Sequence, residues 1–484
     1  MSRKWTALIL AGSLLTGAGG TYAGMSWWES RQNPNNATET SKQGQAGNSS
    51  EESASELQKV SQAYDLIKNR YVEKVEEDTL VEGAIQGMLS KLEDPYSVYM
   101  NEETAKQFNQ TLESSFEGIG AEVSSVDGKI VIVSPFKGSP AEKAGLKPND
   151  QILKVDNESV IGLDLYEATL KIRGEKGTKV KLEIQRDGLS KPLKVEIKRD
   201  EIPLETVHGE IKEQNGKQVG YIEITTFSEN TADDFKKKLK AFEKEGIDGL
   251  ILDVRGNPGG LLVSVEQILR ELVTDKKPYV QIEQRNGEKL RYFSELKKKK
   301  KYDIAILINK GSASASEILA GALNEAEGYA LIGETTFGKG TVQQAVPMGD
   351  GSNIKLTLFK WLTPDGNWIH KKGIAPTVEV SQPAMYRTQP LNLEEPLKLD
   401  MNDEQVQHAQ EILKGLGFSP GRTDGYFSEK TETAVKAFQQ VKDLKPTGII
   451  DEKTASNLVE AIRAELRKEK NDLQLKTALK YVSK

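Results

Sequence analysis

The chain has 484 residues and a formal net charge of −6, from 66 Lys and Arg against 72 Asp and Glu. A domain takes about 150 residues, so the length predicts roughly three domains, and the charge gives no electrostatic reason to expect nucleic acid as a partner. The absence of cysteine excludes disulfides, thiolate catalysis and cysteine-based zinc sites. With only three histidines, His208, His370 and His408, a histidine-based triad or metal site has almost no residues to use.

Residues 1–28 predict export. A basic flank, Ser2-Arg-Lys, precedes an uncharged run from Trp5 to Trp28 that is long enough to span a bilayer, which takes about 20 residues. The basic side stays in the cytoplasm and the rest of the chain is exported. We favour an uncleaved signal anchor that holds the protein at the membrane. A cleaved signal peptide, with Thr21-Tyr-Ala as its small-residue site, is the alternative.

The next two segments differ in composition. Residues 29–54 contain no large apolar residue and are dominated by Asn, Ser, Gly, Gln and Glu, which predicts a flexible linker. Residues 55–111 have apolar side chains at helical spacing, and Asp94-Pro breaks the second helix. We expect this helical segment to support the body of the protein or to form a homodimer.

The rest of the chain predicts a multidomain protein of mixed α/β and α+β class. Residues 112–200 are short strands punctuated by glycine, proline and asparagine turns, with two helical stretches. Residues 201–385 alternate strands with helices, as in a sheet covered by helices. The C-terminal segments are a connector (386–400), a small helical unit (401–464) and a charged, helix-prone tail with no assigned role (465–484).

A first candidate site is the segment Asn309-Lys-Gly-Ser-Ala-Ser-Ala-Ser-Glu, where a buried strand ends and a helix begins. Such a place suits a nucleophilic serine, because small neighbours let a substrate approach and free N–H groups at a helix start can stabilise an oxyanion. Ser314-x-x-Glu317 is also a capping box. On this stretch alone, the cap is the better interpretation.

A second segment, Gly333-Glu-Thr-Thr-Phe-Gly-Lys-Gly-Thr-Val-Gln, changes that balance. A serine needs a base, and with histidine nearly absent Lys339 is the remaining candidate if burial lowers its pKa toward neutrality. Gln343 can hold the amine by a hydrogen bond, and Ser-Lys dyads are a known arrangement. The segment also matches most of a phosphate-binding loop, but Gly340 stands where Ser or Thr would hold magnesium, and Pro347 argues against a following helix.

A third segment, Asp253-Val-Arg-Gly-Asn-Pro-Gly-Gly, is a strand end, a glycine turn and a helix start. It can offer backbone N–H groups to an anion. An ordinary strand-to-helix turn, which needs glycine anyway, is the alternative.

Together these segments resemble the C-terminal processing peptidases, the S41 family of serine proteases, over roughly residues 90–385. Leu92-Glu-Asp-Pro-Tyr-Ser resembles a further motif of the family. The resemblance implies a serine endopeptidase that cleaves exported or membrane-associated proteins and needs no cofactor and no metal. A non-catalytic PDZ and cell-wall binding protein is the alternative.

The resemblance assigns roles to particular residues. It makes Ser314 the nucleophile, Lys339 the general base and Gln343 the residue that orients the lysine. It also places backbone amides at the oxyanion hole, from Gly259, Gly260 and Ala315. The intact catalytic set speaks against a non-catalytic protein.

Residues 112–200 resemble the PDZ domain that this family carries, with Gly118-Ile-Gly-Ala as the carboxylate-binding loop. Such domains bind a peptide C-terminus as an added strand. Substrate C-termini with an apolar last residue are therefore expected at Gly118, Ile119, Gly120 and Ala121. Arg173 is expected to couple peptide binding to the active site, and a surface salt bridge is an equal alternative.

Residues 401–464 resemble the peptidoglycan-binding domain, through Val406-Gln-His-Ala-Gln-Glu-Ile-Leu, Thr423-Asp-Gly-Tyr-Phe and Ala434-Val-Lys-Ala-Phe-Gln-Gln. The resemblance implies an extracytoplasmic protein retained at a bacterial membrane and wall. The alternative is a helical bundle that only packs on the protease or on a second copy. His408 is interpreted as a packing or surface residue and His370 as incidental.

Overall fold

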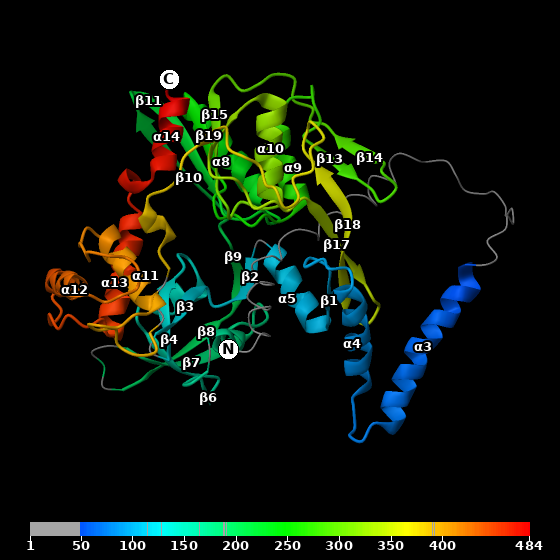
Figure 1. Ribbon diagram of the computed structural model, residues 1–484, viewed down its shortest axis with the longest axis horizontal. Coiled ribbons are helices and arrows are strands. Elements are labelled where there is room, and N and C mark those ends of the chain that lie inside the picture. The colour runs from blue at the N-terminus through cyan, green and yellow to red at the C-terminus, as the bar shows by residue number, and fades with distance from the viewer. Residues whose placement is uncertain are drawn as a thin grey trace.

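The computed structural model describes residues 49–484 apart from residues 114, 127, 164, 187, 188, 190, 390 and 392 (Figure 1). The predicted signal anchor, residues 1–28, and most of the predicted linker lie outside the described residues. Within the part that is described, no helix is long and apolar enough to cross a membrane.

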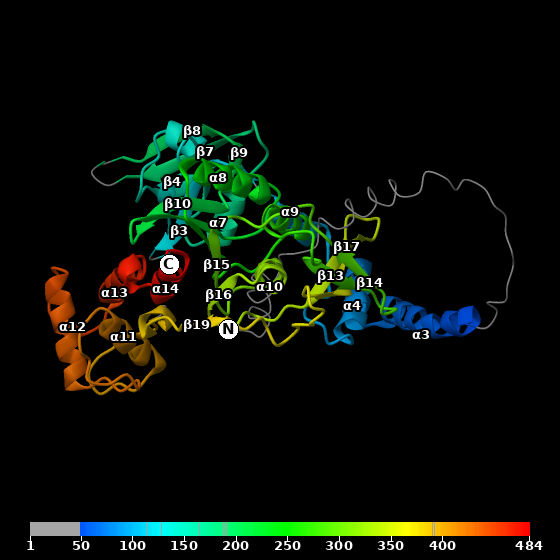
Figure 2. The same cartoon turned by 90° about the horizontal axis from the view of Figure 1, so that it is seen from above.

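Two helices form an arm at the N-terminal end of the described chain. They are α3 (Ser49–Arg70) and α4 (Glu77–Ser90), joined by an ion pair of 2.6 Å between Lys68 and Glu77. α3 begins inside the segment predicted as linker, and it lies out to one side of the body of the molecule in both views (Figures 1 and 2). The arm leaves large apolar side chains exposed: Leu57, Val60, Leu66, Ile67, Tyr71, Val81 and Met88.

The segment predicted as helical also contains a strand. β1 (Val98–Met100) pairs antiparallel with β18 (Asn353–Leu362), and α5 (Glu102–Leu112) follows it. Asn101 caps α5, because its side chain accepts a hydrogen bond of 2.9 Å from the Thr104 N–H. The end of this segment is therefore part of the protease body and not of the arm.

The β-rich domain is a sheet with short helices beside it. Its core is made by alternate residues of the strands, among them Ile130, Ile132, Val180, Leu182 and Ile184. The spatial order is β3 (Ala121–Val126), β4 (Lys129–Pro135), β5 (Gln151–Val155), β7 (Lys179–Gln185) and β8 (Leu193–Lys198), with β6 (Glu158–Ser159) on β5 and helices α6 (Pro140–Lys143) and α7 (Leu165–Ile172).

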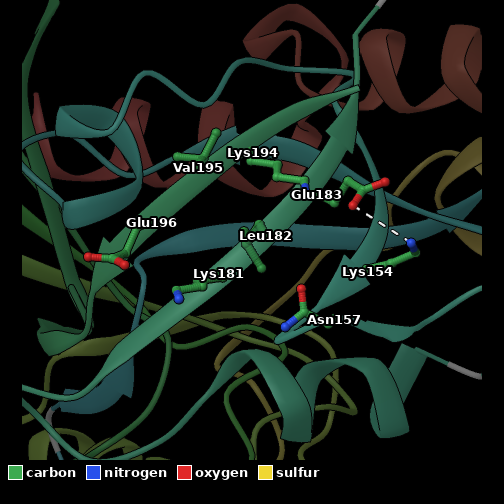
Figure 3. A pocket seen from close by; sticks show the side chains of 8 residues that line it. All are labelled: Lys154, Asn157, Lys181, Leu182, Glu183, Lys194, Val195 and Glu196. Atoms are coloured by element: carbon green, nitrogen blue, oxygen red, sulfur yellow. Dashed lines mark ion pairs between the residues drawn. The ribbon is translucent and has the colours of Figure 1, made fainter. Parts of the chain in front are cut away.

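A shallow pocket of about 240 Å³ lies on this sheet (Figure 3). Lysine and glutamate side chains of β5, β7 and β8 line it, and Lys154 and Glu183 form an ion pair of 3.7 Å across it. Its mixed, exposed charges do not define a binding site. A ribbon of β2 (Ser115–Gly118) and β9 (Asp200–Pro203) joins the domain to the rest of the chain.

The α/β body is built on a six-stranded sheet that is parallel except for its first strand. Its strands are, in spatial order, β10 (Val207–Gln214), β11 (Lys217–Ile224), β12 (Gly249–Asp253), β15 (Asp303–Ile308), β16 (Ala330–Gly333) and β19 (Val378–Glu379). One face packs on α8 (Thr231–Glu245), α9 (Leu262–Leu272) and α10 (Ala315–Glu327). The predicted alternation of buried strands and helices is confirmed.

A second sheet stands beside this body. β18 is its central strand, paired with β1 and β13 (Val280–Glu283) on one side and β17 (Thr341–Pro347) on the other, and β14 (Lys289–Tyr292) pairs with β13. β17 contains the last three residues of the second candidate segment, Gln343 among them, and begins two residues after Lys339, so this sheet fixes the position of both.

The C-terminal helical unit contains α11 (Glu404–Gly415), α12 (Glu429–Val441) and α13 (Glu452–Leu466) around one core. A short 3-10 helix precedes the unit in the sequence, η1 (Ala384–Arg387), and another follows it, η2 (Glu469–Asn471). Leu391, Leu393 and Leu397, from the segment predicted as a connector, pack into the same core. That segment is therefore part of the folded unit.

The charged tail ends in a helix that belongs to the α/β body. α14 (Leu473–Val482) places Leu475, Ala478, Leu479 and Val482 against the sheet face opposite α8–α10. Asp472 caps the N-terminus of α14 and forms an ion pair of 2.8 Å with Arg255. The helical unit is thus inserted between β19 and the last helix of the body (Figure 1).

Candidate active site

The three candidate segments meet at the carboxyl ends of β12, β15 and β16, where open α/β sheets form their sites. The turn after β12 touches the turn after β15, since a Cβ built on Gly259 would lie 2.8 Å from the Ser314 Cβ. Asn309 Oδ1 accepts a hydrogen bond of 2.8 Å from the Gly256 N–H. The structure therefore joins segments that lie about 50 residues apart in the sequence.

Two of the three serines in the turn are committed to holding it together. The Ser312 hydroxyl donates to the Val254 carbonyl at 2.7 Å, and the Ser316 hydroxyl donates to the Asn257 carbonyl at 2.9 Å. Both side chains are fully buried. Ser312 and Ser316 are therefore structural residues, and of the three serines Ser314 is left as the candidate nucleophile.

Ser314 has a strained backbone at the start of α10. Its φ of 54° and ψ of −114° lie in a region that residues with a side chain rarely adopt. Strain of this kind persists only where the surroundings impose it and is concentrated at functional sites. A sharp strand-to-helix turn that presents a strained serine is also the geometry of other hydrolase nucleophiles.

Glu317 joins the serine turn to the lysine loop. Its Oε2 accepts hydrogen bonds from the Ser314 N–H at 2.9 Å and from the Lys339 N–H at 2.8 Å. Its Oε1 accepts from the Gly338 N–H at 2.7 Å and from the Thr336 hydroxyl at 2.6 Å. Burial raises the pKa of Glu317, against these four hydrogen bonds, which lower it. One buried carboxylate therefore fixes the backbones of both predicted catalytic residues.

Lys339 is buried, with 1% of its surface exposed, and its ammonium nitrogen lies 5.0 Å from the ring centre of Tyr96. Burial and then repulsion by Lys355 lower the pKa of Lys339 to about 7, against Glu317 and Asp94, which raise it. An amine with this pKa is largely neutral at slightly alkaline pH, as a general base must be.

Two indoles fix the backbone around Lys339. Trp361 donates to the Lys339 carbonyl at 2.7 Å and Trp368 to the Gly340 carbonyl at 2.8 Å. His370 stacks on Trp368 with 5.1 Å between ring centres and meets the edge of Tyr96 at 6.4 Å. His370, which we interpreted from the sequence as incidental, therefore belongs to the wall of this site.

Gln343 is fully buried, and its amide group donates to the hydroxyls of Thr341 at 2.9 Å and Thr357 at 3.0 Å. Its Oε1 has no hydrogen-bond partner among the described residues. A buried acceptor without a donor costs free energy, and an amine N–H of Lys339 would satisfy it. In the conformation described, hydrogen bonds from Lys339 to Ser314 or Gln343 are absent, and such bonds often tighten only when substrate binds.

The glycine turn places backbone N–H groups near Ser314, and one of these N–H groups already donates a hydrogen bond within the turn. The Gly259 N–H donates to Asn257 Oδ1 at 2.8 Å. Gly259 and Gly260 have φ values of 111° and 143°, and a Cβ on Gly260 would lie 2.1 Å from the Phe227 carbonyl oxygen. In this conformation the Gly259 N–H is therefore not free for an oxyanion, which leaves the amides of Gly260 and Ala315.

The predicted peptide-binding loop lies at the edge of the β-rich domain. Gly118 ends β2, Ala121 begins β3, and the Ile119 carbonyl accepts from the Ala141 N–H at 2.8 Å. Gly120 has a φ of 74°, and a Cβ there would lie 2.5 Å from the Ser139 Cβ. The loop is thus a tight turn that requires glycine.

Arg173 lies beside this loop. Its guanidinium is 4.9 Å from the ring centre of Phe116, on β2, and its Cγ is 3.7 Å from a Cβ built on Gly118. The side chain therefore contacts the ribbon that joins the β-rich domain to the body, as its predicted place at that boundary requires.

Sequence reasoning missed part of this site. Glu317 was predicted only as a helix cap, while Lys355, Trp361 and Tyr96 were assigned no role. The signal for Lys355 was a lysine inside the alternating strand Asn353-Ile-Lys-Leu-Thr-Leu. Within the described residues, no group of His, Asp and Glu side chains could hold a metal ion.

Four family models match the chain. Residues 218–380 match peptidase family S41, residues 118–197 a PDZ domain and residues 402–458 a putative peptidoglycan binding domain. Residues 14–104 match the N-terminal domain of the activating protease CtpB.

Curated relatives match nearly the whole chain. The carboxy-terminal processing protease CtpB of Bacillus subtilis (strain 168) is 58% identical over 480 residues, 99% of each chain. The carboxy-terminal processing protease CtpA of the same strain is 45% identical over 89% of this chain and 91% of its own. Among solved structures, the photosystem II D1 C-terminal processing protease is 28% identical, with a TM-score of 0.42 over 68% of this chain and 93% of its own.

Proposed function

The chain belongs to peptidase family S41 and is a carboxy-terminal processing serine protease with a PDZ domain, and from this premise we propose that it cuts with a Ser314–Lys339 dyad. The observation that supports the dyad is the carboxylate of Glu317, whose single Oε2 accepts from the backbone N–H of both residues. The non-catalytic alternative loses its support, because the near full-length relatives are proteases.

In the proposed mechanism, the neutral amine of Lys339 takes the proton of the Ser314 hydroxyl as its oxygen attacks the scissile carbonyl. The amides of Gly260 and Ala315 hold the oxyanion, and Gln343 Oε1 orients the amine. The lysine ammonium then protonates the leaving amine. Water, deprotonated in turn by Lys339, releases the acyl group from Ser314 and restores the starting state.

Covalent labelling of the parent enzyme with a fluorophosphonate tests this assignment of the nucleophile. We expect the phosphonate on the peptide that contains Ser314, as mapped by mass spectrometry, because only an activated serine reacts with such probes. Ser314→Ala should remove the label. A label on Ser312 or Ser316, or an unchanged yield in Ser314→Ala, would contradict the assignment.

We further propose that the PDZ domain selects substrates by their C-termini, with the terminal carboxylate held by the backbone of residues 118–121. The tight loop and its glycine requirement support this role. We propose that Arg173 couples peptide binding to the protease body, because its guanidinium contacts Phe116 in the ribbon that joins the two. Titration with peptides that have apolar C-termini, compared with their C-terminal amides, measures this preference. Equal affinity for the free peptides and their amides would contradict recognition of the terminal carboxylate.

Two parts of the chain support a location at the cell surface. The peptidoglycan-binding domain supports an extracytoplasmic, wall-associated protein. We propose that residues 1–28 remain as a signal anchor in the membrane, which the uncharged run in the sequence supports. Fractionation of cells that express the full chain measures this, and release of the protein in high salt without detergent would exclude the anchor.

We propose that the arm formed by α3 and α4 joins two copies in a homodimer. It exposes a row of large apolar side chains that an isolated chain would leave in water. Leu66→Glu combined with Ile67→Glu should shift the sedimentation coefficient from dimer to monomer. The control is Lys59→Glu, which changes charge on an exposed position of the same helix. A dimer that survives the double substitution would place the interface elsewhere.

A further inference from the structure

A second buried lysine lies near the proposed base. Lys355, on β18, is 1% exposed, and together with Lys339 it is one of the largest fully buried side chains. Its ammonium nitrogen lies 5.0 Å from the ring centre of Phe108 on α5. Within the described residues, no carboxylate is close enough to form an ion pair with it. A buried, unpaired ammonium is costly, which calls for a reason for its position.

The strand register places the side chain of Lys355 on the same face of the sheet as Gln343 and Thr357, next to the proposed base. Thr357 pairs with Gln343, and Lys355 pairs with Ala345, on the neighbouring strand β17. Side chains two apart on a strand share a face, so Lys355 points to the side where Gln343 meets Thr357. The phenyl ring of Phe108 covers Lys355 from α5.

The charged groups around this row are few. Asp94, in the loop before β1, attracts the protons of Lys339 and Lys355, and Glu317 attracts the proton of Lys339. His370, whose ring meets the edge of Tyr96 at 6.4 Å, has its pKa lowered by burial and Lys371, against the charge of Asp94, which raises it. Burial, opposed by Asp94, lowers the pKa of Lys355 to about 8, one step above that of Lys339. The lower value belongs to Lys339, because Lys355 acts on it as a neighbouring like charge.

We propose that Lys355 is a positioning residue whose buried ammonium keeps the amine of Lys339 unprotonated and so available as the base. A neighbouring cation is a known way to activate a lysine, because two like charges in a dry site disfavour each other. Both lysines are buried, so salt screens the repulsion only weakly. This inference rests on the proposed role of Lys339.

The pH dependence of kcat/KM in Lys355→Met, with casein as substrate, tests the inference. Methionine keeps the length and apolar stem of the side chain but has no charge. We expect the acidic limb to move to higher pH by about one unit, which lowers activity about fivefold at pH 7 and about tenfold at lower pH, and leaves it near the parent value above pH 9. Lys355→Arg, which keeps the charge, should restore the parent limb.

The control is Lys289→Met, on β14 of the same sheet, whose exposed amine pairs with Glu283 at 3.6 Å and should leave the limb unchanged. A purely structural role for Lys355 lowers activity by the same factor at every pH. That result, or an unmoved limb in Lys355→Met, would overturn the inference.

A second measurement separates this inference from the proposed dyad. In the Ser314→Ala background, the rate at which acetic anhydride modifies Lys339, followed by mass spectrometry, reports the pH at which its amine becomes neutral. We expect the midpoint to rise when Lys355→Met is added. An unchanged midpoint would overturn the inference about Lys355, whereas full protease activity of Ser314→Ala would overturn the dyad instead.

Discussion

Replacing Glu317 by alanine is expected to lower casein cleavage at least about 100-fold and to destabilise the protein by about 3 kcal/mol or more. The substitution leaves three backbone N–H groups and the Thr336 hydroxyl without their acceptor in a buried place. Each buried donor left unpaired costs about 1–3 kcal/mol. The turn of Ser314 and the loop of Lys339 also lose the group that holds them at a fixed distance.

Urea unfolding and initial cleavage rates measure the two effects of Glu317→Ala. Glu317→Gln keeps one oxygen and should fall between the parent and the alanine variant. Glu271→Ala is the matched control, because it removes a glutamate of α9 that forms only a surface contact of 3.8 Å with Lys236. An alanine variant with parent-like activity would show that Glu317 is only a helix cap.

Much of the site could be predicted because its signals are local in the sequence. Apolar runs ending in glycine-rich turns marked β12 and β15, and the change to a helix after Ser314 followed from the capping pattern. Parallel strands bring their carboxyl ends to one edge of the sheet, so residues that follow different strands are expected to lie close together there.

The contacts that complete the site could not be predicted, because they join positions with no common pattern. The capping box correctly predicted that Glu317 would accept from Ser314. Nothing in it showed that the same carboxylate would also accept from Gly338 and Lys339, more than 20 residues later. The pairing of β1 with β18 is likewise a long-range contact, and a three-residue strand has too few positions for a period to show.

The last helix carried a signal that its charges obscured. Leu475, Ala478, Leu479 and Val482 repeat at the spacing of one helical face, as a helix that covers a sheet requires. Lysines between them gave the segment the composition of a solvated tail. The sheet face that this helix covers could be identified only in the structure. There the ion pair between Arg255, which follows β12, and Asp472 holds the start of the helix at the sheet.

Ser314→Ala and Lys339→Ala are expected to have the largest effects on activity. Loss of a nucleophile costs up to about 10⁶-fold in kcat, and loss of a general base about 10²–10⁴-fold. Residues that act as a unit are not additive, so the double variant should be no less active than Ser314→Ala alone. Both variants should stay folded, since Glu317 holds the backbone of each residue and not its side chain.

The most direct measurement is cleavage of casein by residues 30–484, compared with Ser314→Ala, Lys339→Ala and the double variant, each checked by circular dichroism. The Ser-Lys mechanism predicts that the parent cleaves, that each folded single variant loses activity, and that the double variant loses no more than Ser314→Ala. Cleavage at the parent rate by either folded single variant would contradict the mechanism.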